Sequence, residues 1–149
     1  MGQRAVNAKR QARLQQALAL GSAHRTTLRA TTSEAQLRAQ RFACDIGKLL
    51  SDDKCEDIIV LDLRAISSVC DYFVIATGTS ERQMRAVIEH IEELGRQRSE
   101  KPFSRAGLEG SSWMIIDYVD VVVHLFDAHH RSYYELETLW GDAPRVDWA

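Results

Sequence analysis

The chain has 149 residues, the length of one ordinary domain, which excludes a second domain of similar size. Its composition, 45% hydrophobic and 27% charged with eight glycines and two prolines, excludes collagen-like, low-complexity and wholly disordered chains. No apolar run approaches the roughly 18 residues of a membrane-spanning helix, and no apolar segment near the N-terminus resembles a secretory signal. We therefore expect a soluble protein with no membrane partner that is not exported.

Charge is divided unevenly along the chain. Residues 1–33 carry six Lys or Arg and no acidic residue, whereas the remaining 116 residues carry 13 basic and 21 acidic ones. The N-terminal segment is therefore +6 and the body −8. Phosphate contacts need clustered Lys and Arg, so the acidic body does not favour general nucleic-acid binding. It favours a protein-binding surface or an enzyme for a neutral or cationic substrate.

The basic segment, residues 1–32, is predicted to lie outside the folded domain. Three interpretations remain open: a disordered or loosely helical tail, an electrostatic tether to RNA, and an organelle transit peptide. We place the folded domain at residues 33–146 and a short tail at 147–149.

The cysteines indicate a reducing compartment. Cys44, Cys55 and Cys70 are odd in number and lie 11 and 15 positions apart, which fits neither a disulfide framework nor a zinc knuckle. The five histidines are not spaced as metal ligands either. We expect no metal site and no cofactor.

The domain is predicted to begin with a helix. Ser33 and Gln36 have the spacing of a capping box, and apolar residues then recur every three or four positions through Lys48. Residues 51–54 end the pattern. The predicted apolar stripe comprises Ala35, Ala39, Phe42, Ile46, Leu49 and Leu50.

Residues 58–63 and 72–77 are continuous apolar runs, which indicates central strands buried on both faces. Residues 64–71 are too few for a helical crossover, so these strands should pair antiparallel. Ser80 and Gln83 form a second capping box before a helix that reaches about Arg98. Its predicted core-facing residues are Met84, Val87, Ile88, Ile91 and Leu94. Residues 101–110 are expected to form a loop with a short edge strand near Phe103.

Residues 113–117 and 120–126 predict a hairpin with a two-residue link, Tyr118-Val119. In that register Trp113 faces His124, Ile115 faces Val122 and Asp117 faces Asp120. The opposite hairpin face is wholly apolar and should contact the helices; it contains Met114, Ile116, Val121, Val123 and Leu125. A helix over residues 133–140, stopped by Gly141, and an extended segment from Asp142 complete the domain.

Catalytic motifs are weak in this sequence. The Gly78-Thr79-Ser80 turn before a helix could bind phosphate, but no complete phosphate-binding motif surrounds it, so a capped turn is favoured. A nucleotidyltransferase would also need two carboxylates one residue apart on a strand, and no Asp-x-Asp exists. No G-x-S-x-G elbow is present. His124, in mid-strand opposite Trp113, is interpreted as a stacked, hydrogen-bonded histidine with a structural or binding role.

The hairpin face that carries Trp113 stands out, because it combines aromatic residues with acids and a histidine, as partner-binding surfaces do. Three segments of the chain are recognisable: DYFVIATGTSERQMRAVIEHIEE (71–93), WMIIDYVDVVVHLF (113–126) and YYELETLWGDAPRV (133–146). The chain resembles the Iojap, or ribosomal silencing factor, family over about residues 33–146.

The resemblance implies an α/β fold with a compact mixed β-sheet and flanking helices, similar to a nucleotidyltransferase without its catalytic acids. It implies a binder and not an enzyme. The expected partner is protein fourteen of the large ribosomal subunit, bound so that the small subunit cannot join and translation is repressed under nutrient limitation. The resemblance implies a cytoplasmic location, or an organellar matrix in a eukaryote, and allows a homodimer off the ribosome. The alternative is a nucleotide-dependent transferase.

The partner-binding residues implied by the motif match are Trp113, Asp117, Tyr118, His124, Phe126 and Tyr134. One departure concerns the hairpin turn, where the family usually reads Asp-x-Gly-Asp and this chain has Val119 in place of the glycine. A β-branched residue disfavours the positive φ that glycine supplies, so the turn type and the placement of Tyr118 are open.

Overall fold

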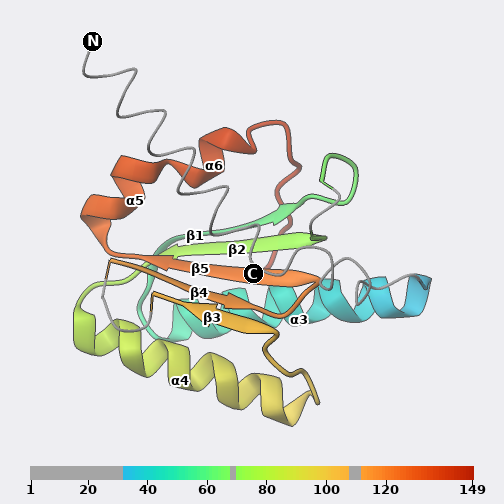
Figure 1. Cartoon of the computed structure of the whole chain (residues 1–149), viewed down its shortest axis with the longest axis horizontal. Coiled ribbons are helices and arrows are strands. Elements are labelled where there is room, and N and C mark those ends of the chain that lie inside the picture. Colours follow the sequence, from blue (N-terminus) through green and yellow to red (C-terminus); the bar gives the residue numbers. More distant parts are fainter. Residues whose placement is uncertain (1–31, 68–69, 108–111) are drawn as a thin grey trace.

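The computed structural model describes residues 32–67, 70–107 and 112–149. Within these ranges a five-stranded sheet, ordered β1-β2-β5-β4-β3, lies between helices on both of its faces (Figure 1). β2 and β5 are parallel and the other neighbours are antiparallel, which confirms the predicted mixed α/β sheet. The elements are α3 (Ser33–Asp52), β1 (Glu56–Asp62), β2 (Tyr72–Thr77), α4 (Glu81–Gln97), β3 (Ser104–Ala106), β4 (Trp113–Asp117), β5 (Val121–Phe126), α5 (Ala128–Tyr134) and α6 (Leu136–Leu139).

Helix α3 starts as predicted but with a different cap. The Thr32 hydroxyl oxygen accepts from the backbone N–H of Ala35 at 3.1 Å, so Thr32, not Ser33, is the N-cap. Thr32 has the extended backbone that a cap requires, whereas Ser33 is already helical. The helix also continues past Lys48 to Asp52 and buries Phe42 and other residues of its apolar stripe.

Strands β1 and β2 pair antiparallel as predicted, but β1 is not a central strand. β2 is buried throughout, whereas β1 lies at one edge of the sheet. Its outer side is covered in part by the C-terminal segment. The N–H of Asp62 donates to the carbonyl of Pro144 at 2.9 Å, and the N–H of Val146 donates to that of Val60 at 2.8 Å. An apolar run therefore does not distinguish a central strand from an edge strand that another segment covers.

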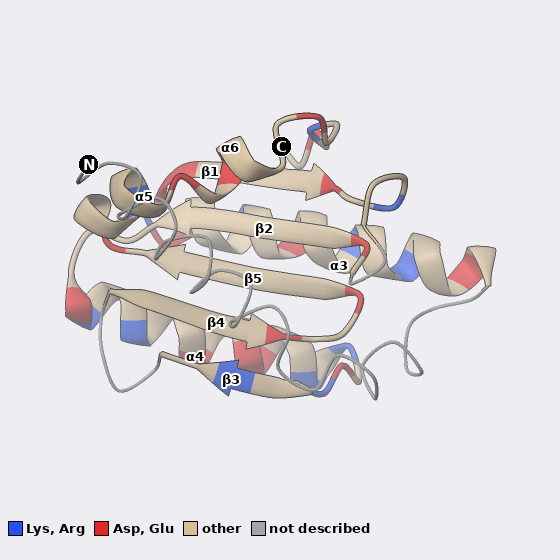
Figure 2. Ribbon diagram, turned by 45° about the horizontal axis from the view of Figure 1, so that its top comes forward, with Lys and Arg blue, Asp and Glu red and all other residues tan. Residues whose placement is uncertain are grey.

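Helix α4 begins as predicted at the Ser80 cap, whose hydroxyl oxygen accepts from the N–H of Gln83 at 3.0 Å. The side chain of Gln83 accepts from Thr79 N–H at 2.9 Å, which closes the turn one residue earlier than in a standard capping box. The predicted short edge strand is present as β3. Arg105, coloured blue on β3 in Figure 2, pairs with Glu92 of α4 at 2.8 Å.

The hairpin of β4 and β5 is present, but its register differs by two residues from the prediction. Trp113 pairs with Phe126, Ile115 with His124 and Asp117 with Val122. The turn residues are Val119-Asp120, because Tyr118 N–H donates to the carbonyl of Val121 at 2.8 Å. Side chains alternate between faces with a period of two, so a shift of two residues leaves each side chain on its predicted face.

The predicted helix over residues 133–140 is instead two short helices, α5 and α6. Glu135, between them, has φ 47° and ψ 48°, a left-handed conformation that interrupts a helix. Asp127 is the N-cap of α5, and its carboxylate accepts from His130 N–H at 2.7 Å. Residues 128–132, which precede the predicted start at residue 133, are therefore already helical.

The sheet thus has two cores, one on each face (Figure 1). We call the face under α3 and α4 the α3–α4 face, and the opposite one the α5–α6 face. Met114, Ile116, Val121, Val123 and Leu125 all lie in the core of the α3–α4 face, as predicted. Trp148 also packs on this core, with its ring against Gly47 of α3.

Candidate partner-binding surface

Trp113 opens β4 and lies on the α5–α6 face, where it is half-buried. Its ring stacks on Phe126, with centroids 4.9 Å apart and planes 24° apart, and contacts Tyr134 of α5 at 4.6 Å. Its Nε1–H donates to Nδ1 of His124 at 3.1 Å. We call Trp113, His124, Phe126 and Tyr134 the aromatic cluster. These contacts from β5 and α5 hold the indole in one orientation.

His124 lies in the interior of the sheet and stacks on Phe126, with ring centroids 6.4 Å apart. It is completely buried, and its ring meets Phe73 edge-on at 4.7 Å. The indole N–H can only donate, so Nδ1 of His124 must accept, which places the proton of the neutral imidazole on Nε2. The stacked, hydrogen-bonded histidine expected from the sequence is confirmed.

Asp117 and Tyr118 lie at the other end of β4. The carboxylate of Asp117 accepts from Val119 N–H at 2.7 Å and so fixes the turn. Tyr118 points to the α3–α4 face, where it meets Phe42 edge-on at 5.0 Å. Burial raises the pKa of Tyr118 to about 12. Tyr118 and Trp113 therefore lie on opposite faces of the sheet.

The hairpin face chosen from the sequence as an exposed surface is mostly interior. We predicted a partner-binding surface here because aromatic residues, acids and a histidine share this face, yet β5 is buried throughout. α5, α6 and residues of the C-terminal segment cover this face, and internal hydrogen bonds engage Trp113 Nε1, His124 Nδ1 and the carboxylate of Asp117. Of the six predicted site residues only Trp113 keeps a partly exposed side chain; Asp117, Tyr118, His124, Phe126 and Tyr134 are each 8% exposed or less.

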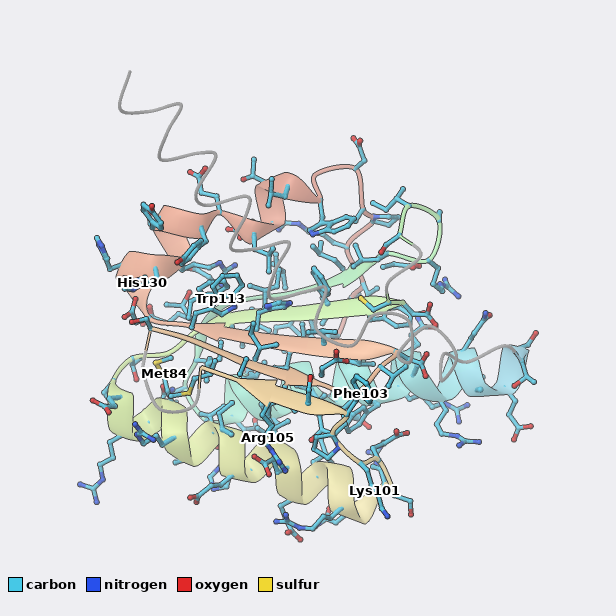
Figure 3. The ribbon with its side chains drawn as sticks, in the orientation of Figure 1. Met84, Lys101, Phe103, Arg105, Trp113 and His130 are labelled. Carbon is cyan, nitrogen blue, oxygen red and sulfur yellow. The ribbon has the colours of Figure 1, made fainter. Side chains whose placement is uncertain are left out.

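The exposed apolar side chains nearest to the aromatic cluster belong to α5 and α6. Tyr133 is 37% exposed and meets Tyr134 edge-on at 4.9 Å, and Leu139 on α6 is 40% exposed. His130 stacks on Tyr134 at 6.1 Å, and Figure 3 shows it on α5 at the same end of the sheet as Trp113. Sequence reasoning missed these residues because it placed one helix, not two, after residue 132. A helical projection of 128–134 would have separated Tyr133 from the buried Tyr134.

The Gly78-Thr79-Ser80 turn is occupied by its own contacts, as the capped-turn interpretation predicts. Gly78 N–H donates to the carbonyl of Phe126 at 2.7 Å, and Thr79 N–H to the side chain of Gln83. Among the described residues, no group of three or more His, Cys, Asp or Glu side chains could hold a metal ion. In the same ranges no helix is long and apolar enough to cross a membrane. The basic segment 1–31 lies outside the described residues.

The comparisons with known proteins agree with this architecture. A crystal structure of a Chromobacterium violaceum protein superposes with a TM-score of 0.65 at 32% identity, covering 68% of this chain and 85% of that one. A family model described as "Ribosomal silencing factor during starvation" matches residues 36–149. Ribosomal silencing factor RsfS of Bacillus subtilis is 40% identical over 111 residues, covering 74% of this chain and 89% of that protein. Mouse "Mitochondrial assembly of ribosomal large subunit protein 1" is 32% identical over 95 residues, covering 62% of this chain and 42% of that protein.

The sheet and its flanking helices define a mixed α/β domain with the fold of solved silencing-factor relatives. The chain belongs to the ribosomal silencing factor family. The names of its relatives refer to silencing of the ribosome and, in the mouse protein, to assembly of the large subunit. Family membership therefore supports a regulatory role in translation and association with the ribosome.

Proposed function

We propose that the chain binds the large ribosomal subunit through ribosomal protein fourteen and sterically blocks joining of the small subunit, which represses translation when nutrients are limiting. The observation that carries this proposal is a half-buried tryptophan, Trp113, that the other three residues of the aromatic cluster hold rigidly in a chain of this family. A tryptophan fixed in this way loses little conformational entropy on binding, which is a property of interface hot spots.

The six predicted site residues have different roles in this proposal. Trp113 contacts the partner. His124, Phe126 and Tyr134 position the indole ring of Trp113 from within the protein. Tyr133, exposed on α5, extends the contact surface. Asp117 and Tyr118 act on the hairpin turn, at the far end of β4. The chain acts as a binder without catalysis, in the cytoplasm or in an organellar matrix, and pairs with a second copy when off the ribosome.

Substitution of Trp113 tests the contact. We expect Trp113→Ala to weaken binding to isolated large subunits by about 2 kcal/mol or more, measured by co-sedimentation in sucrose gradients. Trp113 also packs on Phe126 and Tyr134, so the variant should lose some stability as well.

Trp148→Leu is the matched control, because it alters a second half-buried tryptophan, on the α3–α4 face. It should lower the melting temperature while leaving co-sedimentation unchanged. Equal binding by Trp113→Ala and the unchanged chain, or an equal loss in Trp148→Leu, would show that Trp113 is not the contact.

We further propose that the basic segment 1–32 adds an electrostatic contact to ribosomal RNA. Deleting it should lower affinity for large subunits at low salt and flatten the slope of log K against log salt, because fewer counterions are released. Binding to isolated ribosomal protein fourteen should not change. If the slope of log K against log salt is unchanged after the deletion, residues 1–32 do not contact ribosomal RNA. A passive tail and an import signal would then be the remaining interpretations of this segment.

A further inference from the structure

The carboxyl ends of the parallel strands β2 and β5 lie at the same end of the sheet. After β2 the chain enters α4 on one face, and after β5 it enters α5 on the other (Figure 1). In open α/β sheets, ligands bind at this kind of point, where successive helices leave toward opposite faces. A hollow of about 410 Å³, within the size range of small-molecule sites, lies beside this end of the sheet, where the start of β1 meets α5, α6 and the C-terminal segment. Its lining residues are Asp57, Ile58, Ile59, Arg131, Glu137 and Arg145.

Arg131 is the most unusual residue of this hollow, because only 10% of its charged side chain is exposed. Its Nη1 donates to the hydroxyl of Thr77 at the end of β2 at 3.1 Å, and its Nε donates to Glu137 at 3.2 Å. Its Nη2 donates to none of the described residues. A largely desolvated guanidinium with free donors in a cavity wall has a strong preference for an anionic acceptor.

The hollow also carries two opposite charges that are not used within the described structure. The side chains of Asp57 and Arg145 are exposed, and neither has an ion pair or a side-chain hydrogen bond among the described residues. Asp57 lies where the register of β1 shifts, and its φ of 48° is left-handed. The lining therefore combines two guanidinium groups, two carboxylates and the half-buried apolar side chain of Ile59, which lies on the α5–α6 face.

We propose that this hollow binds a small zwitterion, a free α-amino acid. Its carboxylate accepts from Arg131 Nη2 and from Arg145, its ammonium group donates to Asp57, and its aliphatic part lies on Ile59. A ligand with only negative charge would meet the carboxylates of Asp57 and Glu137, and one with only positive charge would meet the two arginines. The mixed lining thus selects a molecule that carries both charges.

The test uses the purified full-length chain without ribosomes, so its outcome is independent of the proposed silencing function. Amide chemical shifts are followed by NMR during titration with glycine, the smallest zwitterion of this class, and with L-leucine, up to about 10 mM, which saturates a Kd of about 1 mM. We expect shifts at residues 57–59, 131, 137 and 145. L-leucinamide, which lacks the carboxylate, and N-acetyl-L-leucine, which lacks the ammonium group, should each bind at least about tenfold more weakly.

Two exposed substitutions test the assigned residues without disturbing the core. Arg145→Gln and Asp57→Asn should each weaken L-leucine binding at least about tenfold and leave the melting temperature unchanged. Arg82→Gln, on the exposed side of α4, is the matched control and should bind as the unchanged chain does. No shift with either glycine or L-leucine overturns the proposal. If N-acetyl-L-leucine or inorganic phosphate binds as tightly as L-leucine, the hollow does not select a zwitterion and the proposal is wrong. The proposal is also wrong if both variants bind L-leucine as the unchanged chain does.

Discussion

The two faces of the sheet are closed in different ways. Helices α3 and α4, of 20 and 17 residues, cover the α3–α4 face, and each has a side-chain N-cap. Helices α5 and α6, of seven and four residues, cover the α5–α6 face and are separated by the left-handed Glu135. The first core is largely aliphatic, whereas the second face buries His124 and Arg131 and carries most of the ring contacts.

We infer from this difference that the α3–α4 face contributes mainly to stability and the α5–α6 face mainly to the orientation of side chains. Apolar contacts are non-directional and contribute stability in proportion to the area buried. Hydrogen bonds such as those of Trp113 to His124 and of Arg131 to Thr77 and Glu137 are directional and fix orientation. We therefore expect changes on the α3–α4 face to affect folding first, and changes on the α5–α6 face to affect binding first.

The largest effect should come from a charge on the α3–α4 face. Val123 of β5 is fully buried there, with α3 and α4 above it. Val123→Asp would place an unpaired carboxylate in an apolar core, at a cost above about 4 kcal/mol. We expect the variant to lose cooperative unfolding in thermal melts followed by circular dichroism. A soluble variant that melts near the unchanged chain would mean that the faces are assigned the wrong way round.

Much of the α3–α4 face could be predicted because its signals are local. The Ser80 cap depends on residues three positions apart, and the apolar stripe of α4 on spacing within one helix. The alternation in β4 and β5 correctly identified the hairpin face that contacts α3 and α4, even though the predicted register was wrong by two residues.

The α5–α6 face was harder to predict because long-range packing decides it. Nothing in β1 shows that residues 144–146 cover its edge. No local pattern shows that α5 would bury His124 and Phe126, or that Arg131 would reach Thr77, 54 positions away. The break at Glu135 is likewise a backbone conformation that a Glu residue does not favour. Of the predicted site residues, Trp113 is therefore partly exposed and the other five are interior.

An intermediate effect is expected where β3 leads toward β4. Gly107 has φ 74°, and a Cβ atom placed on it would lie 1.9 Å from the carbonyl oxygen of Trp113. Gly107→Ala must therefore move the backbone that precedes or contains Trp113, and should cost about 2 kcal/mol in urea unfolding. Ribosome binding should weaken along with it.

Gly141→Ala is the control for this variant. Its Cβ would lie 3.3 Å from the nearest atom, the carbonyl oxygen of Thr138, and its φ is not in the left-handed region. We expect a change below about 1 kcal/mol. Similar losses of stability in the two glycine variants would show that the close approach to Trp113 is not a constraint.

The smallest effect should come from the hairpin turn that joins β4 to β5. Val119 has φ 75°, so the turn keeps a positive φ although a β-branched residue occupies the position. The Asp117 carboxylate, which accepts from Val119 N–H at 2.7 Å, holds this conformation in place.

Val119→Ala and Val119→Gly both remove a buried side chain, but only glycine also relieves the strain at positive φ. Glycine usually lowers stability relative to alanine because it is more flexible when unfolded. Here we expect the reverse: Val119→Gly should exceed Val119→Ala in free energy of unfolding by about 1 kcal/mol in urea titrations. If alanine is instead the more stable of the two, the turn must relax to a conformation without positive φ, and the orientation of Tyr118 would change with it.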